Sequence, residues 1–349
     1  MDNWIWLIIL AIGSFSTTFG LTWFLSKFFL KKGIYGHDVH KLDRPKVAEM
    51  GGVGLVIVLI LASLSSLFIF PEFREHFIVG LIVILLVAAI GVWDDLKTLG
   101  PITKPFLLLF PGLPIIIWQL IVNPQLQPSE LLLFSPTPYL PLIGSVRITY
   151  VYWLLIPIAI TVLSNTSNML DVMNGSTPAT MLFVSGTGII STIVLHLFGV
   201  TTLPGMVFSI ILFSCLFAFF WFNKYPAKIF CGDTGSLTIG AVIALVAIFG
   251  RIEIIILVAM MPQIMNSFQI IHSVKGFRER REIKERPTKL LDDERVAANS
   301  SLKAPLTLTR WIVARKPLKE NEIVLTMGII SFVSCLLAIF TMLMIIVAI

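Results

Sequence analysis

Residues 77–97 read FIVGLIVILLVAAIGVWDDLK, an apolar run that ends in two adjacent carboxylates, Asp94 and Asp95. A run of this length is typical of a helix that crosses a bilayer. An Asp at the bilayer centre costs about 2.5 to 3.5 kcal/mol on insertion scales, so the pair is expected at the membrane surface. Because adjacent residues do not share a helix face, the two carboxylates are expected to have separate tasks. Taken alone, the pair could equally be an ordinary polar helix end.

The composition of the whole chain places it in the same class. The 349 residues are 56% hydrophobic and only 13% charged, which is too little charge to cover a soluble surface. We therefore expect an all-α polytopic membrane protein. The first apolar run, 4–30, is too long for the core of a signal peptide and is expected to be a mature span. The three cysteines show no metal-ligand spacing and predict neither a disulfide nor a zinc site.

About ten apolar runs are long enough to cross the hydrocarbon core, which predicts about ten transmembrane helices. They are expected at 4–30, 50–70, 77–93, 105–122, 148–164, 179–200, 203–222, 235–250, 252–271 and 323–348. All basic residues except Arg74, Arg147 and Arg251 then belong to the odd-numbered connections. The positive-inside rule orients those connections toward the cytoplasm, with both termini on the non-cytoplasmic side. The net charge of +6 thus indicates membrane topology rather than nucleic-acid binding.

Two connections are long. The stretch 123–147, on the non-cytoplasmic side, is rich in proline and apolar residues, and an extended or hairpin-like cover is expected there. The stretch 272–322 carries dense alternating charge and is expected to be a cytoplasmic loop within a single integral-membrane domain, 1–349. No internal repeat is visible.

The third odd-numbered connection carries polar residues at every third position: Asn165, Asn168, Asp171 and Asn174. If the helix persists, these side chains form a slowly drifting row along one side. Amides and a carboxylate can ligate a hard cation and donate to phosphate oxygens. An asparagine-rich helix cap and turn is the alternative.

The fourth odd-numbered connection, 223–236, reads NKYPAKIFCGDTGS. Gly232 and Gly235 permit close approach of backbone N–H groups, and Asp233 and Thr234 stand where the next helix begins, a place that favours phosphate. Asp233 could equally be a helix cap. The Asp-Thr-Gly triplet also resembles the aspartic-protease signature, but that fold is a soluble all-β domain.

Two further cytoplasmic features allow two interpretations each. Lys104 precedes an apolar helix and is either a snorkelling interfacial lysine or a point charge held at a diphosphate. His37 and His40, three residues apart in the first connection, suggest a metal pair only weakly, and a solvated loop is favoured.

The motifs, taken in order, resemble those of the polyprenyl-phosphate N-acetylhexosamine-1-phosphate transferases over nearly the whole chain. They are Asp94-Asp95, Asn165-x-x-Asn168 and Asn223-x-Tyr-Pro-x-x-x-Phe230-x-Gly232-Asp233-Thr234. Within that family, Gly36-x-Asp38-x-x-Lys41-x-Asp43-x-Pro45-Lys46 and Met261-Pro262-Gln263-x-x-Asn266 resemble the eukaryotic and archaeal branch, which transfers GlcNAc-1-phosphate to dolichyl phosphate. The Arg-His-Arg group of that branch matches Arg278-Glu279-Arg280, and the histidine cluster of the bacterial branch is missing.

The resemblance implies transfer of GlcNAc-1-phosphate from UDP-GlcNAc to a polyprenyl or dolichyl phosphate with release of UMP, the first membrane step of lipid-linked oligosaccharide synthesis for protein N-glycosylation. It implies catalytic roles for Asp94, Asp95, Lys104, Asn168 and Asp233. Mg²⁺, with Mn²⁺ as a substitute, would be held by Asp233 and Asn168. The substrate-binding residues would be Glu49, Asn165, Asn174, Phe230, Arg278 and Arg280.

The implied setting is a lipid bilayer with the active site facing the cytoplasm, in the plasma membrane of an archaeon or bacterium or the endoplasmic reticulum of a eukaryote. A homodimer is compatible with the sequence, and nucleic acid is not expected as a partner. One alternative is the same reaction with another UDP-N-acetylhexosamine for a cell-envelope polymer. A transporter is disfavoured, because its intramembrane acids would lie near the midplane, often within repeated halves.

Overall fold

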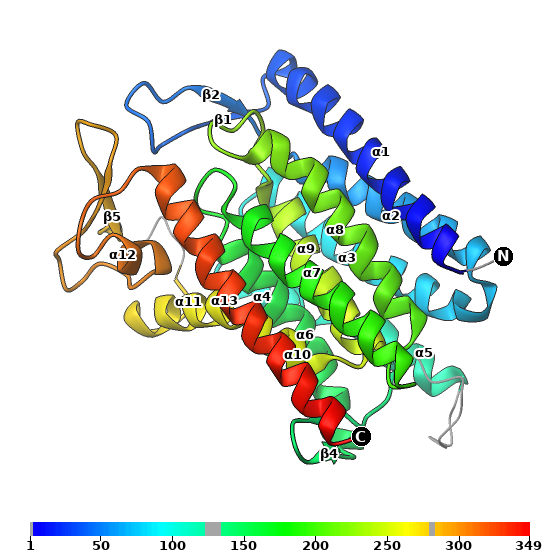
Figure 1. Ribbon diagram of the computed structural model, residues 1–349. Coiled ribbons are helices and arrows are strands. Elements are labelled where there is room, and N and C mark those ends of the chain that lie inside the picture. Colours follow the sequence, from blue (N-terminus) through cyan, green and yellow to red (C-terminus); the bar gives the residue numbers. More distant parts are fainter. Residues whose placement is uncertain (1–2, 123–133, 279–282) are drawn as a thin grey trace.

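The computed structural model describes residues 3–122, 134–278 and 283–349, which form a bundle of helices with three short hairpins (Figure 1). The helices are α1 (Asn3–Lys32), α2 (Gly52–Ile69), α3 (Arg74–Leu96), α4 (Thr103–Leu107), α5 (Leu113–Val122), α6 (Thr149–Met169), α7 (Ser176–Leu197), α8 (Leu203–Asn223), α9 (Gly232–Gly250), α10 (Glu253–Ala259), α11 (Met261–Ser273), α12 (Leu308–Ile312) and α13 (Glu320–Val347). The antiparallel strand pairs are β1 (Tyr35–His37) with β2 (Lys46–Ala48), β3 (Tyr139–Leu140) with β4 (Gly144–Ser145), and β5 (Thr288–Leu290) with β6 (Val296–Ala298).

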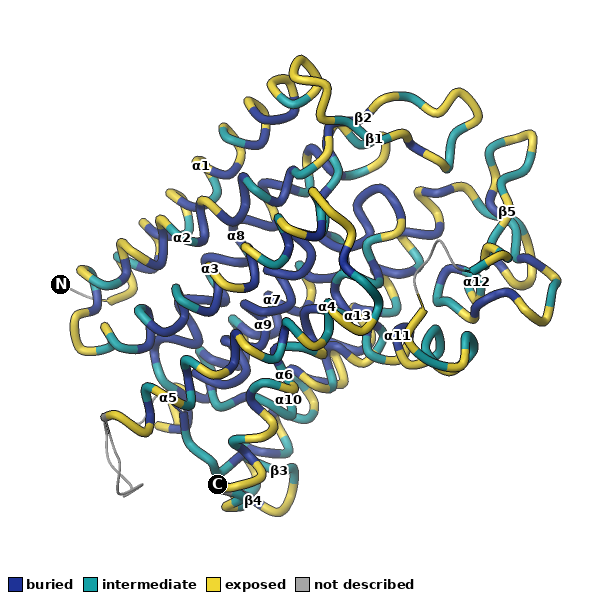
Figure 2. Tube along the Cα trace, turned by 180° about the vertical axis from the view of Figure 1, so that it is seen from behind, coloured by how far each residue is buried: buried dark blue, intermediate teal, exposed yellow. Residues whose placement is uncertain are grey.

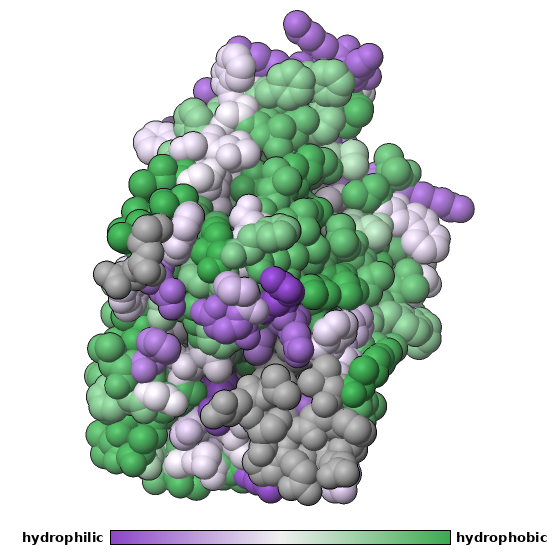
Figure 3. Space-filling model, turned by 90° about the vertical axis from the view of Figure 1, so that its right-hand side faces the viewer, coloured by the Kyte–Doolittle hydropathy of each residue, from purple (hydrophilic) through white to green (hydrophobic). Residues whose placement is uncertain are grey.

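The helical membrane class predicted from composition is confirmed. Within the described residues, 9 helical segments are long and apolar enough to cross a membrane, or up to 10 if the bent pair α10 and α11 counts as one span. Apolar side chains cover most of the face seen in Figure 3, and hydrophilic ones gather in small patches and at the upper margin. Such a surface suits contact with lipid.

Two predicted spans are interrupted. The expected helix 252–271 bends by 65° between α10 and α11, where Pro262 occupies the start of the second piece. The expected helix 105–122 consists of α4, a 3₁₀ turn (Phe110–Gly112) and α5. Its prolines, Pro105, Pro111 and Pro114, lack the N–H that a continuous helix needs. Because hydropathy identifies a span by its length and composition alone, it could not predict these breaks.

Helix α9 forms the centre of the bundle. In its most apolar window 89% of the residues are buried, and α2, α3, α6 and α8 pack around it. The dark core in Figure 2 runs along these elements. Close approach depends on small residues: a Cβ on Gly240 would lie 2.1 Å from the carbonyl oxygen of Leu163 on α6. Small residues at helix crossings are typical of membrane bundles, where packing rather than hydrophobicity holds helices together.

The two ends of the bundle differ. The hairpins β1–β2 and β5–β6 lie at one end, whereas both termini and the β3–β4 hairpin lie at the other (Figure 1). We call the end with β1–β2 and β5–β6 the hairpin end. It carries interfacial cation–π pairs, with Lys27 3.9 Å from the Trp23 ring and Lys224 4.0 Å from the Trp221 ring. Such pairs favour the boundary between water and lipid. The β3–β4 pair also gives the connection 123–147 the expected hairpin, although 123–133 lies outside the described residues.

Candidate functional site

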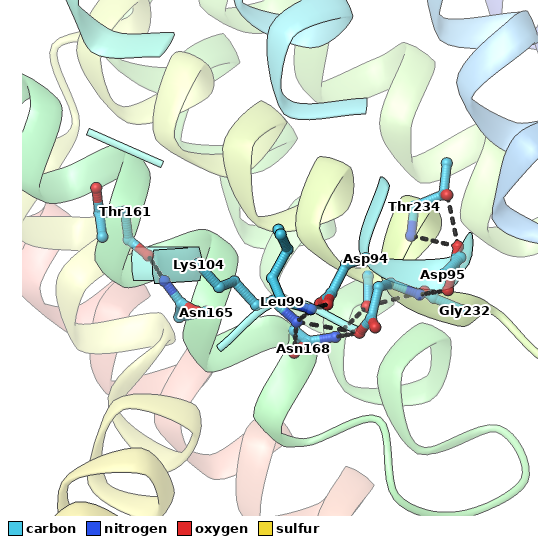
Figure 4. Close-up of polar contacts among 11 residues, drawn as sticks. Asp94, Asp95, Leu99, Lys104, Thr161, Asn165, Asn168, Gly232 and Thr234 are labelled. Carbon is cyan, nitrogen blue, oxygen red and sulfur yellow. Dashed lines mark hydrogen bonds and ion pairs between the residues drawn. The ribbon is translucent and has the colours of Figure 1, made fainter. Parts of the chain in front are cut away.

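Four residues from separate elements meet at the hairpin end, and we refer to Asp94, Lys104, Asn168 and Asp233 as the Lys104 cluster (Figure 4). The Lys104 Nζ lies 2.6 Å from Asp94 Oδ2, 2.8 Å from Asn168 Oδ1 and 3.2 Å from Asp233 Oδ1. The Asn168 amide also donates to Asp233 Oδ1 and, at 2.9 Å, to the hydroxyl of Ser236. The site therefore gathers one cation, two acids and one amide in a few ångströms.

The folding of residues 94–104 explains how Lys104 reaches Asp94. The carboxylate Oδ1 of Asp94 accepts a hydrogen bond from the backbone N–H of Leu99 at 2.6 Å, which closes the connection between α3 and α4. Lys104 then lies on the first turn of α4 and points back to the end of α3. Asp94 is buried at 5% exposure, so its charge needs this partner.

Asp95 has different partners from Asp94, as expected for neighbours on a helix. It accepts hydrogen bonds from the backbone N–H groups of Asp233 (2.7 Å) and Thr234 (3.0 Å), and from the Thr234 hydroxyl (2.6 Å). The N-cap residue Cys231 gives α9 no side-chain cap. A carboxylate from α3 therefore takes the capping position and complements the positive end of the α9 dipole.

The predicted row of polar residues on the third odd-numbered connection is wrong beyond Asn168. Helix α6 ends at Met169, and Gly175 adopts a left-handed conformation with φ of 86°, so Asp171 and Asn174 lie in a turn rather than on a helix face. Asn165 stays on the helix, but its amide donates to the carbonyl oxygen of Thr161 at 2.9 Å. Asn165 is therefore not part of the Lys104 cluster.

Asn174 is buried in a second polar network. Its amide nitrogen donates to Asp38 Oδ2 at 2.9 Å, and its backbone N–H donates to Glu320 Oε1 at 2.7 Å. Sequence reasoning placed neither acid in a site. Asp38 carried a signal, since it belongs to the Gly36–Lys46 motif, whereas Glu320 carried none beyond its place at the start of a helix.

Glu49 and Phe230 lie side by side at the edge of the β1–β2 hairpin. The backbone N–H of Phe230 donates to the Ala48 carbonyl, and the N–H of Gly51 donates to the Phe230 carbonyl, both at 2.8 Å. Partial burial raises the pKa of the Glu49 carboxyl, and the negative charge of Asp95 raises it further. This edge therefore adjoins the capped start of α9.

The remaining predicted residues lie in the last connection. Arg278 is exposed just after α11, and Arg280 falls outside the described residues. In the described part of the chain, no group of three or more His, Cys, Asp or Glu side chains could hold a metal ion. All three cysteines are buried as free thiols.

The oxygens of the Lys104 cluster nevertheless suit a hard cation. Asn168 Oδ1 and Asp233 Oδ1 both face the Lys104 ammonium, which shows that these two oxygens accommodate a positive charge. Mg²⁺ usually takes only one or two carboxylates and completes its shell with water and phosphate oxygens. The residues present therefore fit such an ion in the presence of a phosphorylated substrate.

The fold and the site define a polytopic membrane protein with a charged, amide-lined site at one end of its bundle. The chain belongs to glycosyl transferase family 4, whose sequence pattern matches residues 77–251, the stretch that holds the whole Lys104 cluster. Membership in this enzyme family confirms the resemblance drawn from the motifs.

Relatives come from both branches. A Methanocaldococcus jannaschii protein named as a glycosyltransferase is 32% identical over 88% of this chain and 88% of its own length. A Saccharolobus solfataricus protein named as UDP-N-acetylglucosamine–dolichyl-phosphate N-acetylglucosaminephosphotransferase is 29% identical over 68% of this chain and 69% of its own. The Nautilia profundicola phospho-N-acetylmuramoyl-pentapeptide-transferase is 26% identical over 86% of this chain and 82% of its own length.

Proposed function

We propose that the protein transfers GlcNAc-1-phosphate from UDP-GlcNAc to a polyprenyl phosphate of the dolichyl type. A phosphate oxygen of the lipid attacks the β-phosphorus, the bond from that phosphorus to the oxygen bridging the two phosphates breaks, and UMP leaves with the bridging oxygen. The product is GlcNAc-diphosphate-lipid. In an N-glycosylating organism this would be the first membrane step of lipid-linked oligosaccharide synthesis.

The observation that carries this proposal is the Lys104 cluster. Phosphoryl transfer depends on positioning and charge neutralisation more than on covalent chemistry by the protein. Lys104 would neutralise the diphosphate, and Asp94 would hold the lysine in place at 2.6 Å. Asp95, bonded to the first N–H groups of α9, would orient Asp233. A strong base is not required, because a phosphate monoester has a second pKa near about 6 and is already ionised at neutral pH.

Asp233 and Asn168 are the residues that would hold Mg²⁺ in this reaction. When bound, the ion would neutralise charge on the diphosphate. The edge formed by Glu49 and the half-buried Phe230 would border the uridine, with the Phe230 ring available for stacking, and Arg278 and Arg280 would contact the sugar. Asn174 would act at the same nucleotide, held by its bonds to Asp38 and Glu320.

The second candidate is the same chemistry on another UDP-N-acetylhexosamine for a cell-envelope polymer. The similarity to phospho-N-acetylmuramoyl-pentapeptide-transferases favours it. The archaeal relatives named for UDP-N-acetylglucosamine and dolichyl phosphate favour the first candidate.

One incubation separates these candidates. Purified protein is mixed with Mg²⁺, a polyprenyl phosphate and a panel of UDP-sugars labelled in the sugar and, separately, in the β-phosphate. We expect both labels of UDP-GlcNAc in the lipid fraction, with release of UMP and loss of product on adding a chelator. Release of UDP would exclude sugar-phosphate transfer, and preference for another UDP-sugar would select the second candidate.

A further inference from the structure

Two buried acids outside the Lys104 cluster converge on one amide. Asp38, in the loop after β1, is 2% exposed, Glu320, the first residue of α13, is 3% exposed, and Asn174 between them is 4% exposed. Asn174 donates to both, from its amide nitrogen to Asp38 at 2.9 Å and from its backbone N–H to Glu320 at 2.7 Å. Its amide nitrogen also lies 3.5 Å from the second Glu320 oxygen.

Such a pair of acids is a costly way to hold a turn. Burying a carboxylate is unfavourable unless it is paired and hydrogen-bonded, and an apolar contact of equal volume is often more stabilising. In the described parts of the chain, Lys41 is the only cation within ion-pair distance of either acid, 3.3 Å from Asp38 Oδ2. The arrangement therefore specifies a geometry rather than maximising stability.

The geometry that it specifies belongs to the turn Leu170–Gly175, which we call the Asn174 turn. The Ser176 hydroxyl lies 2.8 Å from the Leu170 carbonyl oxygen and 2.9 Å from that of Met173, so the turn is closed on itself. The N–H of Gly175 donates to Asn223 Oδ1 at 3.2 Å. These bonds fix the turn internally and tie it to Asn223 at the end of α8.

The Asn174 turn begins two residues after Asn168 of the Lys104 cluster. Its Asp171 N–H donates to the carbonyl oxygen of Asn168 at 3.0 Å, and Asn168 contacts both Lys104 and Asp233. A displacement at the turn is thus transmitted to the last turn of α6. The His40 ring, 3.1 Å from the Val172 carbonyl oxygen, ties the same turn to the loop that carries Asp38.

We propose that Asp38 and Glu320 are positioning residues, which hold the Asn174 turn and, through it, hold Asn168 against Lys104 and Asp233. For catalysis this inference rests on the proposed function, since misplacement of a reacting group by about 1 Å can cost about 10²-fold in rate. The positioning itself can be measured without the reaction.

The test measures how fast acetic anhydride acylates the Lys104 amine. Mass spectrometry follows the acylation, and the exposed Lys97 serves as the internal reference. Asp38→Asn, Glu320→Gln and Asn168→Ala are each compared with wild type. The control is Glu322→Gln, an exposed acid of the same helix. We expect acylation to rise at least about threefold in the first three variants and to stay unchanged in the control, because each of the three removes or loosens an Asn168 contact.

A double-mutant cycle then separates positioning from general destabilisation. Asp38→Asn should add no further increase once Asn168 is alanine, and the transfer rate of each acid variant should fall at least about tenfold at a similar Tm. An equal increase in both backgrounds, or unchanged Lys104 acylation, would overturn the proposal. If acylation responds as expected but the wild-type protein makes no lipid-linked product, the positioning stands and the proposed function fails.

Discussion

At the scale of single residues, Lys104 is the residue that all other members of the Lys104 cluster contact. Its ammonium group contacts side chains from α3, α6 and α9. These helices are far apart in sequence, so one side chain links the three elements that frame the site. In the proposed reaction the same charge would also neutralise the diphosphate, because lysine is a compact point charge with three donors.

Replacing this lysine should be severe. Lys104→Ala should lower the transfer rate by about 10² to 10³, the effect of losing a preorganised electrostatic contact. The exposed Lys97, on the same connection, provides the control variant Lys97→Ala. Steady-state rates on purified protein measure both, and a loss below about threefold for Lys104 would indicate a lysine that only packs at the interface.

The buried carboxyl of Asp171 is expected to make the free energy of unfolding depend on pH. Burial raises the pKa of this carboxyl to about 7, and the charges of Asp233 and Asp95 add to the effect. Because the pKa is higher in the folded chain, the folded state keeps a proton that the unfolded state releases, and stability falls as pH rises from about 4 to about 7.

Asp171→Asn should remove the loss of stability that wild type shows between about pH 4 and about pH 7. The gain in Tm over wild type should be small near pH 4, grow to a few degrees at pH 7 and then remain level. Thermal unfolding in detergent across this range measures the difference. A gain that does not vary with pH would contradict the assignment.

The residue scale also shows where sequence reasoning succeeds and fails. Asp94, Lys104, Asn168 and Asp233 were expected together, because short motifs carry their chemistry, and the structure brings them together, although their roles stay predictions. The partners of Asn174 lie more than a hundred residues away, so no local pattern could reveal them. Asp171 and Asn174 were expected on a helix face, because their spacing was extended through a helix that ends at Met169.

At the scale of elements, α9 depends on glycines. Gly240→Ala would put a methyl group 2.1 Å from the carbonyl oxygen of Leu163, so α6 or α9 must shift. Overpacking of this kind costs about 1 to 3 kcal/mol. We expect a lower Tm and, because Asn168 and Asp233 lie on these two helices, a lower transfer rate.

A matched substitution isolates this effect. Gly20 lies in α1, and a Cβ there would meet nothing within 4 Å. Since alanine favours a helix over glycine by about 1 kcal/mol, Gly20→Ala should leave Tm unchanged or raise it. Equal losses of Tm for the two variants would show that glycine content, rather than the α6–α9 contact, is responsible.

Hydropathy located the elements well, because apolar length is a strong signal in a lipid-facing chain. It missed the bend between α10 and α11 and the pieces of the fourth span. Both depend on prolines whose effect is local, whereas hydropathy averages over a window.

At the scale of the whole molecule, the distribution of basic residues predicts orientation, which can be tested directly. The native thiols are buried, so a single introduced cysteine reports its own position. Ile143 on the β3–β4 turn is 72% exposed and Leu302 in the last connection is 100% exposed. With a membrane-impermeant maleimide, Ile143→Cys should react in intact cells and Leu302→Cys only after permeabilisation. The reverse pattern would put the Lys104 cluster outside.

The central place of α9 has a consequence for how the chain is made. The helices with the most extensive contacts to it, α2, α3, α6 and α8, all precede it in the sequence. When α9 emerges from the ribosome, these four helices have already been synthesised. The start of α9 carries an aspartate and several hydroxyl groups. We therefore expect α9 to pass from the aqueous translocation channel directly into contact with these helices, without first being surrounded by lipid.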